Sequence, residues 1–410
     1  MATEKQMQFT IKQGMNQDIL KSYPDNYFDS IVTDPPYGIE FLGKDWDKNT
    51  GAIETWEECF RVLKPGGHLL AFSAARTYHH LATNIESVGF EIRDQLMWLY
   101  GSGFPKAQDI GKAIDKRMGK QDPNYGTDKT SVGVPLEGEY KGGQRCNVCN
   151  KTIGTWIKDC KEQDCGMKYN PQTELGQQWA GWKTALKPAH EPIVMARKPF
   201  KGSTIDNVLE HGVGALNIDE SRIESESRMV LTRKEGHNAT LTFDGSKESD
   251  HKDTSDAYEM KEHGGRFPAN VLGEIPEYQK YFYCPKVSRK ERHIGFEKMP
   301  EPVFGDVKGC YDDGKRFAEK HQDLKSTGNN HPTVKPVELM KYLVKLVTPS
   351  GGKVLDPFNG SGSTGMACVE LGYEYVGCEL DPNYVEIANR RIAAWYEHTK
   401  PNNNFGELFE

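Results

Sequence analysis

A strand, a glycine-rich turn, a helix and a second strand follow one another between residues 353 and 380, and this run constrains the fold more than any other feature. KVLD (353–356) reads as a short buried strand, and the turn DPFNGSGSTG (356–365) carries the spacing G-x-G-x-x-G. A helix is predicted from there to about residue 371, followed by the strand YEYVGCEL (373–380). The run predicts an α/β protein with a doubly wound, Rossmann-like sheet.

The glycine-rich turn is a candidate cofactor site. Glycines at positions 360 and 362 let the backbone approach a ligand closely, and the following helix points its N-terminus at that ligand. Glu379 lies 19 residues beyond Gly360, at the end of the next strand, where a carboxylate can accept hydrogen bonds from ribose hydroxyls. The pattern predicts that the turn binds a nucleotide-type cofactor. It leaves open whether this cofactor is a dinucleotide or a methyl donor. The alternative is a tight turn with a purely structural role.

A second chemical motif follows the β-rich run FDSIVT (28–33). It consists of Asp34, Pro35, Pro36 and Tyr37. The prolines fix the backbone and leave the Pro35 carbonyl free to accept. A carboxylate and a carbonyl can accept hydrogen bonds from the two N–H groups of an aromatic amine, and these bonds draw the nitrogen lone pair out of the ring. Tyr37 can stack on a base that has left its duplex. The motif predicts methylation of an exocyclic amine, with a Pro-Pro turn beside a core tyrosine as the alternative.

The remaining periodicity predicts further α/β elements. Strands are expected at 68–74, near 91–100 and within 190–199, and helices at 52–63, 76–87, 337–347 and 384–396. Pro65-Gly66-Gly67 is expected to stop the first helix. Residues 222–265 are rich in small and charged side chains and are expected to form a mobile insertion.

The two motifs together resemble those of the amino-methylating DNA methyltransferases. TDPPYGIEF is similar to their catalytic motif and DPFNGSGSTG to their methyl-donor loop, and the order resembles the permuted β-group. HPTVKPVELM (331–340) resembles the segment that closes over the cofactor, and MNQDIL (15–20) the segment that meets its adenine. Three further stretches, at 97–116, 187–199 and 265–272, resemble phage and prophage members.

The resemblance implies a site-specific enzyme that transfers a methyl group from S-adenosylmethionine to N6 of adenine in double-stranded DNA. It implies catalytic roles for Asp34, Pro35, Pro36 and Tyr37. It implies cofactor contacts from Asp18, Lys335, Asp356, Phe358, Gly360, Gly362 and Glu379, with Lys335 directed at the carboxylate end of the donor.

Four cysteines lie close together in the chain at Cys146, Cys149, Cys160 and Cys165. Four thiolates in two pairs suit one tetrahedral structural zinc, with free reduced thiols as the alternative. A catalytic zinc is not expected because four cysteines leave no open ligand position. The cluster therefore predicts a zinc-stapled insertion.

Charge and hydropathy limit where this protein works. The net charge of −7 excludes a uniformly basic nucleic-acid coat. Local basic stretches occur at 183–201 and 286–298, although each alone reads more simply as a solvated face. No apolar run is long enough to span a membrane and no signal peptide is evident, so a cytoplasmic protein without a membrane partner is expected. A homodimer is an open alternative to a monomer.

The motifs divide the chain into four expected segments. Residues 1–120 are expected to form the catalytic half of the core, and 121–185 the zinc-binding insertion. Residues 186–330 are expected to hold one core strand, the target-recognition region and the mobile loop, and 331–410 the cofactor-binding half.

Several alternative functions stay open. Amino-cytosine (N4) is the nearest rival substrate, with RNA or protein glutamine beyond it. Ring-carbon methylation is disfavoured because no Pro-Cys pair occurs in the sequence. An NAD-dependent dehydrogenase would leave the Asp34–Tyr37 motif without a role, and a non-enzymatic zinc DNA-binding protein would not explain a strand-end carboxylate beside a cofactor loop.

Overall fold

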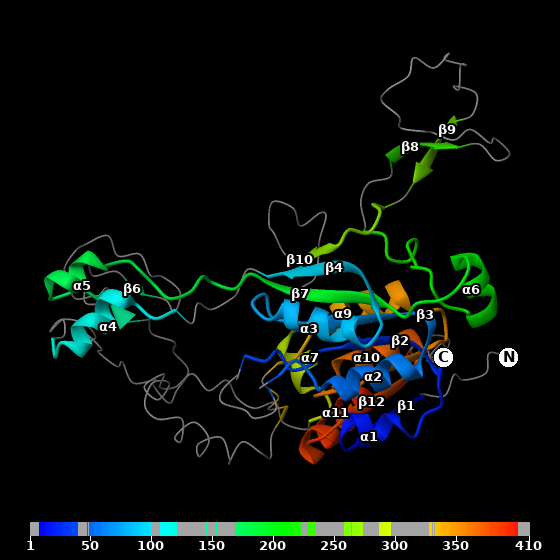
Figure 1. The fold of residues 1–410 in the computed structure, drawn as a ribbon, viewed down its shortest axis with the longest axis horizontal. Helices are drawn as coiled ribbons and strands as arrows, with labels where there is room; N and C mark the ends of the chain where they lie inside the picture. The colour runs from blue at the N-terminus through cyan, green and yellow to red at the C-terminus, as the bar shows by residue number, and fades with distance from the viewer. Residues whose placement is uncertain are drawn as a thin grey trace, which may run out of the picture. The chain divides into compact units, whose positions relative to one another are not determined.

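The computed structural model describes residues 8–39, 47, 49–100, 107–120, 144–145, 152–153, 169–223, 228–233, 258–263, 265–273, 287–296, 328–329, 331 and 333–400. The chain divides into two compact units (Figure 1). Unit 1 comprises residues 1–101 and 190–410, and unit 2 comprises residues 102–189.

Unit 1 is built on one eight-stranded sheet. Its strands, in spatial order, are β1 (Phe9–Gln13), β12 (Glu374–Glu379), β11 (Lys353–Asp356), β2 (Phe28–Thr33), β3 (Leu63–Phe72), β7 (His190–Arg197), β4 (Glu91–Leu99) and β10 (Val271–Gly273). Every neighbouring pair is parallel except the two pairs that β7 makes with β3 and β4. The predicted α/β sheet is confirmed, with one strand running against the others.

Helices cover both faces of the sheet because its strands are apolar on both sides. Successive residues alternate between two cores: Ile31 lies in one and Val32 in the other, as do Leu69 and Leu70. One core also takes side chains of α1 (Asn16–Leu20), α2 (Ile53–Val62) and α3 (Tyr78–Ser87). The other takes side chains of α9 (Val337–Val347), α10 (Ser363–Leu371) and α11 (Pro382–Thr399). The sheet is doubly wound.

The centre of the sheet is the point where its connections part. β11 leads through α10 to β12 on one side, and β2 leads through α2 to β3 on the other. Ligands of such sheets bind where this reversal leaves a crevice at the carboxyl ends of the strands. The turn after β2 and the glycine-rich loop after β11 both start at that edge, because the two strands are parallel neighbours.

Most predicted elements are confirmed. The predictions at 337–347 and 353–356 coincide with α9 and β11, and the helices predicted at 52–63 and 76–87 with α2 and α3 to within two residues. The Pro65-Gly66-Gly67 turn differs: α2 ends at Val62, and β3 begins at Leu63 and runs through that turn. The backbone there is held by β7's end, since Gly66 N donates to Lys198 O (2.9 Å) and Lys198 N to Gly67 O (3.0 Å).

The stretch expected to be a mobile insertion also contains regular structure. An antiparallel ribbon pairs β8 (Arg228–Arg233) with β9 (Tyr258–His263). Five helices that periodicity did not predict are α1, α6 (Thr204–His211), α7 (Arg289–His293) and, in unit 2, α4 (Ile110–Arg117) and α5 (Glu174–Gln178). α6 and α7 each begin with a capping box, at Ser203 and Ser288.

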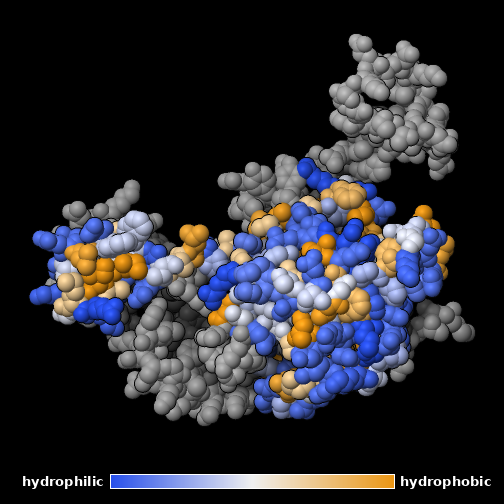
Figure 2. All heavy atoms as spheres, viewed as in Figure 1, coloured by the Kyte–Doolittle hydropathy of each residue, from blue (hydrophilic) through white to orange (hydrophobic). Residues whose placement is uncertain are grey.

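Unit 2 contains α4 (Ile110–Arg117), α5 and a two-stranded pairing of β5 (Gln144–Arg145) with β6 (Thr152–Ile153). The buried carboxylate of Asp115 joins α4 to the chain before α5, because it accepts from Tyr169 Oη (2.9 Å), Gln172 N (2.5 Å) and Thr173 Oγ1 (2.6 Å). Apolar side chains gather on the outside of this unit (Figure 2); the large exposed ones are Met118, Leu175, Trp179, Trp182 and Leu186.

The four cysteines of the predicted zinc site lie outside the described residues. Within the described residues, no group of three or more His, Cys, Asp or Glu side chains could hold a metal. The helices of that same part of the chain are all too short or too polar to cross a bilayer. The zinc site and the functional division into four segments stay predictions.

Candidate active site

The turn after β2 is held rigidly. β2 is buried along its whole length and ends at Thr33, directly before Asp34. Asp47, itself buried, accepts hydrogen bonds from the amides of Tyr37 (2.6 Å) and Gly38 (3.1 Å). The Tyr37 hydroxyl turns back and donates to Asp34 Oδ1 across 2.8 Å. Two prolines and these three hydrogen bonds fix the direction of the Asp34 carboxylate.

Lys335 contacts this turn rather than standing apart from it. Its ammonium donates to Asp34 Oδ2 (2.6 Å) and to the Tyr37 hydroxyl (3.0 Å), and its side chain is only 7% exposed. Burial disfavours the charged form, but the carboxylates of Asp34 and Glu191 outweigh it and raise the pKa of Lys335. The same burial, together with those two carboxylates, raises the pKa of Tyr37 well above its ordinary value. Lys335 is therefore an ammonium here, and Tyr37 a neutral phenol.

Glu191 completes this cluster, although it is not among the site residues predicted from the sequence. Its Oε2 accepts from the Tyr37 hydroxyl (3.0 Å) and lies 3.3 Å from Lys335 Nζ. Glu191 is near the start of β7, whereas the other site residues follow strand ends. Because β7 is antiparallel, its first residues lie at the same edge as the last residues of β3, with Ile193 beside Phe72. A strand-initial acid in HEPIVMARKP is the signal that could have found it.

Asp356 organises the glycine-rich loop from inside the protein. Its carboxylate accepts from Thr33 Oγ1 (2.6 Å), Thr364 Oγ1 (2.7 Å) and Phe358 N (3.1 Å), which join β2, α10 and the loop. Burial raises its pKa to about 6, in spite of these hydrogen bonds. The hydrogen bond to Thr33 links the cofactor loop to the residue that precedes Asp34.

The glycines of this loop are required by geometry. Gly360 has a φ of +53°, and a Cβ on it would lie 2.9 Å from Nε2 of His331. His331 therefore packs over the loop. Burial lowers the pKa of its imidazole to about 4, so the ring is neutral. At Gly365, a Cβ would overlap Ile392 Cδ1, and this glycine allows α10 to pack closely on α11.

Glu379 lies at the end of β12 and faces the same loop. Its Oε2 accepts from Gly360 N (2.8 Å) and its Oε1 from Asp381 N (2.9 Å). Burial raises its pKa to about 7, against the opposing effect of these amides. A half-ionised carboxylate beside a glycine-rich turn is suited to accept hydrogen bonds from vicinal hydroxyls.

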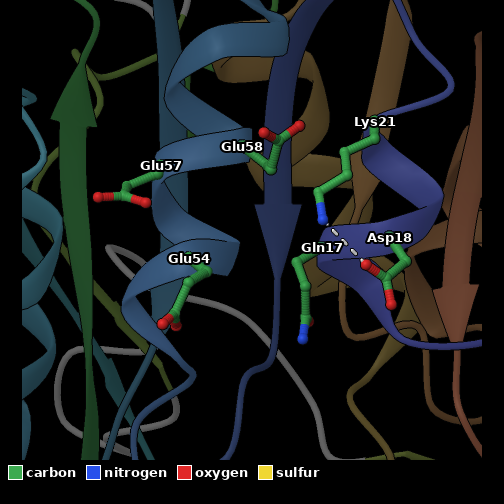
Figure 3. A pocket seen from close by; sticks show the side chains of 6 residues that line it. All are labelled: Gln17, Asp18, Lys21, Glu54, Glu57 and Glu58. Atoms are coloured by element: carbon green, nitrogen blue, oxygen red, sulfur yellow. Dashed lines mark hydrogen bonds and ion pairs between the residues drawn. The ribbon is translucent and has the colours of Figure 1, made fainter.

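The two remaining predicted cofactor residues lie at the side of α1 and α2. Phe358 is partly buried, and its ring packs against Trp56 of α2 at a centroid distance of 5.7 Å. Asp18 is 67% exposed and pairs with Lys21 (3.0 Å). A cavity of about 440 Å³ lies between Asp18 and its neighbours Gln17 and Lys21 on one side and Glu54, Glu57 and Glu58 of α2 on the other (Figure 3). In this segment Asn16 makes the contact with the loop, since its Nδ2 donates to Pro357 O (3.1 Å).

Three cations of the basic stretches are engaged within the protein. Arg197 pairs with Glu91 (2.8 Å), and Lys198 donates to Asn26 Oδ1 (2.8 Å) and Leu63 O (2.8 Å). In the second stretch, Arg292 donates to His331 O (3.3 Å). These cations support the sheet and the loop that carries Lys335.

Comparison with known proteins identifies the family. The sequence matches the DNA methylase profile of N6- and N4-methyltransferases over residues 28–390. The chain belongs to this DNA methylase family. The match spans the turn after β2, β7 and the glycine-rich loop, so all parts of the cluster lie within the matched range. This methylase is an α/β enzyme in which the Asp34–Tyr37 turn precedes the glycine-rich loop in the chain.

Individual proteins that are similar over most of this chain share a low percentage of identical residues with it. The type II methyltransferase M.HindIII of Haemophilus influenzae is 23% identical over 419 residues, which is 91% of each chain. The M1.HpyAVI–SAM complex is a similar solved structure, with 15% identity, a TM-score of 0.38, and coverage of 93% of this chain and 99% of the other. PvuII DNA methyltransferase (cytosine-N4-specific) gives 12% identity, a TM-score of 0.42, and coverage of 96% and 92%. The family assignment rests on the sequence match over residues 28–390.

Proposed function

We propose that this methylase transfers the methyl group of S-adenosylmethionine to the N6 amine of adenine in double-stranded DNA. The observation that carries the proposal is the Asp34 carboxylate, fixed at the end of β2 and joined through Thr33 to the loop after β11. An acceptor suited to the amine beside a loop suited to hold the donor supports the proposal. The catalytic turn comes first in the chain, the order of the permuted β-group, and the DPPY motif favours adenine over cytosine.

The cofactor assignment is supported by the loop's chemistry. S-adenosylmethionine supplies an electrophilic methyl group on a sulfonium. Glu379 would accept from the ribose hydroxyls, Gly360 and Gly362 would admit the donor close to the backbone, and Phe358 would border its adenine. We assign Asp356 to shaping the loop, because its oxygens accept from Thr33, Thr364 and Phe358. Asp18 and Lys335 are further proposed contacts, to the adenine and to the donor's carboxylate end.

Asp34 and Pro35 would act on the target amine. With the base extruded onto the Tyr37 ring, the Asp34 carboxylate and the Pro35 carbonyl accept its two N–H groups and free the nitrogen lone pair. S-adenosylmethionine, when bound, would supply the methyl group: the new nitrogen–carbon bond would replace the sulfur–carbon bond, leave a neutral thioether, and release one amine proton to water. The fixed Asp34 carboxylate would stabilise the positive charge that develops on nitrogen.

The decisive test of this function is nucleoside mass spectrometry of duplex DNA incubated with the protein and labelled S-adenosylmethionine. N6-methyladenine is expected. N4-methylcytosine would change the base but keep the mechanism, and unmodified DNA would contradict the function. In the same preparation, light scattering tests for a homodimer. We further propose that residues 121–185 form a zinc-stapled insertion, that target recognition lies within 186–330, and that the enzyme acts in the cytoplasm.

A further inference from the structure

Two hydrogen-bond donors of the active site each reach the same two carboxylates. The Tyr37 hydroxyl lies 2.8 Å from Asp34 Oδ1 and 3.0 Å from Glu191 Oε2. The Lys335 ammonium lies 2.6 Å from Asp34 Oδ2 and 3.3 Å from the same oxygen of Glu191. Both oxygens of Asp34 are thus engaged by protein donors, and each of these donors has Glu191 as a second acceptor.

This arrangement conflicts with the task that the proposed function gives to Asp34. An incoming amine has to donate to Asp34 as well. Each oxygen of the carboxylate can accept a second hydrogen bond, but Asp34 is a weaker acceptor, and stabilises a developing cation less, while the Lys335 ammonium neutralises its charge. Lys335 cannot simply lose its partner, since an unpaired ammonium at this depth is strongly unfavourable. Among the described residues, Glu191 is the one other carboxylate within ion-pair distance of Lys335 Nζ.

We propose that Glu191 is a positioning residue of methyl transfer. It continues to accept hydrogen bonds from the Lys335 ammonium and the Tyr37 hydroxyl when the Asp34 carboxylate accepts from the target amine. The inference rests on the proposed function and adds a residue to it. Glu191 forms no bond with substrate and exchanges no proton in this role. Glu191 lowers the free energy needed to release Asp34 from these donors, because the Tyr37 hydroxyl and the Lys335 ammonium already contact Glu191 Oε2.

The surroundings of Lys335 make the role testable by pH. Tyr100 follows β4, and burial raises its pKa to about 12, while the pKa of His331 is lowered to about 4. Neither group titrates near neutral pH. Without the Glu191 charge, the pKa of Lys335 is expected to fall, because that charge helps to raise it. The ionisable groups that face Lys335 are Asp34, Tyr37, Tyr100, Glu191 and His331.

The test is the single-turnover rate of methylation by Glu191→Gln between neutral and alkaline pH, at saturating S-adenosylmethionine. At neutral pH the rate is expected to fall about tenfold to a hundredfold, the loss typical of a misplaced reacting group. It should recover as the pH rises, because deprotonation of Lys335 releases Asp34. Cofactor affinity should stay within about threefold of wild type. Glu91→Gln, which removes a carboxylate paired with Arg197 at the other end of β7, is the matched control and should behave as wild type.

Two further variants separate positioning from packing. Glu191→Asp keeps the charge and is expected to recover most of the rate and the wild-type pH profile. In a Lys335→Met background, Glu191→Gln should cost little more, since the ammonium it holds is gone. Three outcomes would overturn the proposal. The first is a wild-type rate in Glu191→Gln, and the second is an equal, pH-independent loss of rate in Glu191→Gln and Glu191→Asp. The third is a double variant with Lys335→Met in which the two losses of rate add. If the Gln variant does not fold, the Asp variant and its cycle with Lys335→Met decide. Absence of methyl transfer by the wild-type protein would instead refute the proposed function.

Discussion

The amide of Gly360 donates to the carboxylate of Glu379 across 2.8 Å, so the glycine-rich loop and the strand-end acid form one unit before any ligand arrives. Burial raises the pKa of Glu379 to about 7. Its state of ionisation therefore changes within the range in which the enzyme would be assayed.

Binding of S-adenosylmethionine should strengthen as the pH rises through 7. A raised pKa means that Glu379 is protonated below that pH, and the proposed ribose contacts favour the ionised form. One linked proton predicts binding about tenfold weaker at pH 6 than at pH 8. Calorimetric titration at several pH values measures this. Glu379→Gln should bind more weakly and lose this part of the pH dependence; an unchanged profile in the variant would contradict the assignment.

Asp34→Ala should abolish methyl transfer and leave cofactor binding largely intact. Loss of a preorganised charge facing a developing cation costs about 3–4 kcal/mol, or a hundredfold to a thousandfold in rate. Single-turnover methylation of duplex DNA measures the effect. The control is Asp25→Ala, which removes an exposed carboxylate paired with Arg61 and should be near neutral. A folded Asp34→Ala protein with the wild-type rate would refute the mechanism.

Tyr37→Phe should slow methylation about tenfold to a hundredfold. Stacking alone would make this change mild, but the Tyr37 hydroxyl contacts Asp34, Glu191 and Lys335. A hydrogen bond to a charged group contributes about 1.5–3 kcal/mol. Tyr37→Ala should lose a further 1–3 kcal/mol, roughly, with the stacking surface. Steady-state and single-turnover rates check both variants.

Tyr342→Phe is the matched control for that change. The buried Tyr342 hydroxyl of α9 has no hydrogen-bond partner within the described part of the chain. Its removal should leave the rate unchanged. Equal effects at Tyr37 and Tyr342 would show that the Tyr37 hydroxyl has no special role.

Gly365→Ala should destabilise the fold by about 1–3 kcal/mol, the usual effect of overpacking a core. The added methyl group would overlap Ile392 and Tyr375, which pack tightly against α10. Urea denaturation followed by circular dichroism measures the change in midpoint. An unchanged midpoint would mean that α10 and α11 can separate at little cost.

Purified protein should contain about one zinc ion per chain, because four thiolates saturate a tetrahedral site. Replacing Cys146 and Cys149 with Ser should release the metal and destabilise the insertion more than the core. Elemental analysis with thermal unfolding tests this. A metal-free preparation of full thermal stability would remove the zinc site from consideration.

Local patterns in the sequence were enough to predict the two halves of the core. The strands before Asp34 and before the glycine-rich loop are short apolar runs with clear breaks, and both are where periodicity places them. Their adjacency follows from the fold class, because parallel strands of a doubly wound sheet end at one edge.

Long-range contacts account for what the sequence did not predict. No local pattern says that β7 runs antiparallel, and this direction brings Glu191 to the Tyr37 hydroxyl and the Lys335 ammonium. Lys335 pairs with the acids beside two distant strands, Asp34 and Glu191, which no local pattern predicts. Likewise, the pairing of β8 with β9 joins two polar stretches that carry little periodicity of their own.

The pairing of β2 with β11 has a consequence for biosynthesis. It places Ser30 and Ile31 beside Val354 and Leu355, which are more than 300 residues later in the chain. The N-terminal strand β1 likewise pairs with β12 near the other end of the chain. During translation, β2 emerges from the ribosome long before β11 exists, so the N–H and C=O groups along that edge of β2 stay unpaired while most of the polypeptide is made. Such high contact order slows folding and exposes the nascent chain to aggregation. We expect this enzyme to depend on chaperones during synthesis more than a protein of equal size whose neighbouring strands follow one another along the chain.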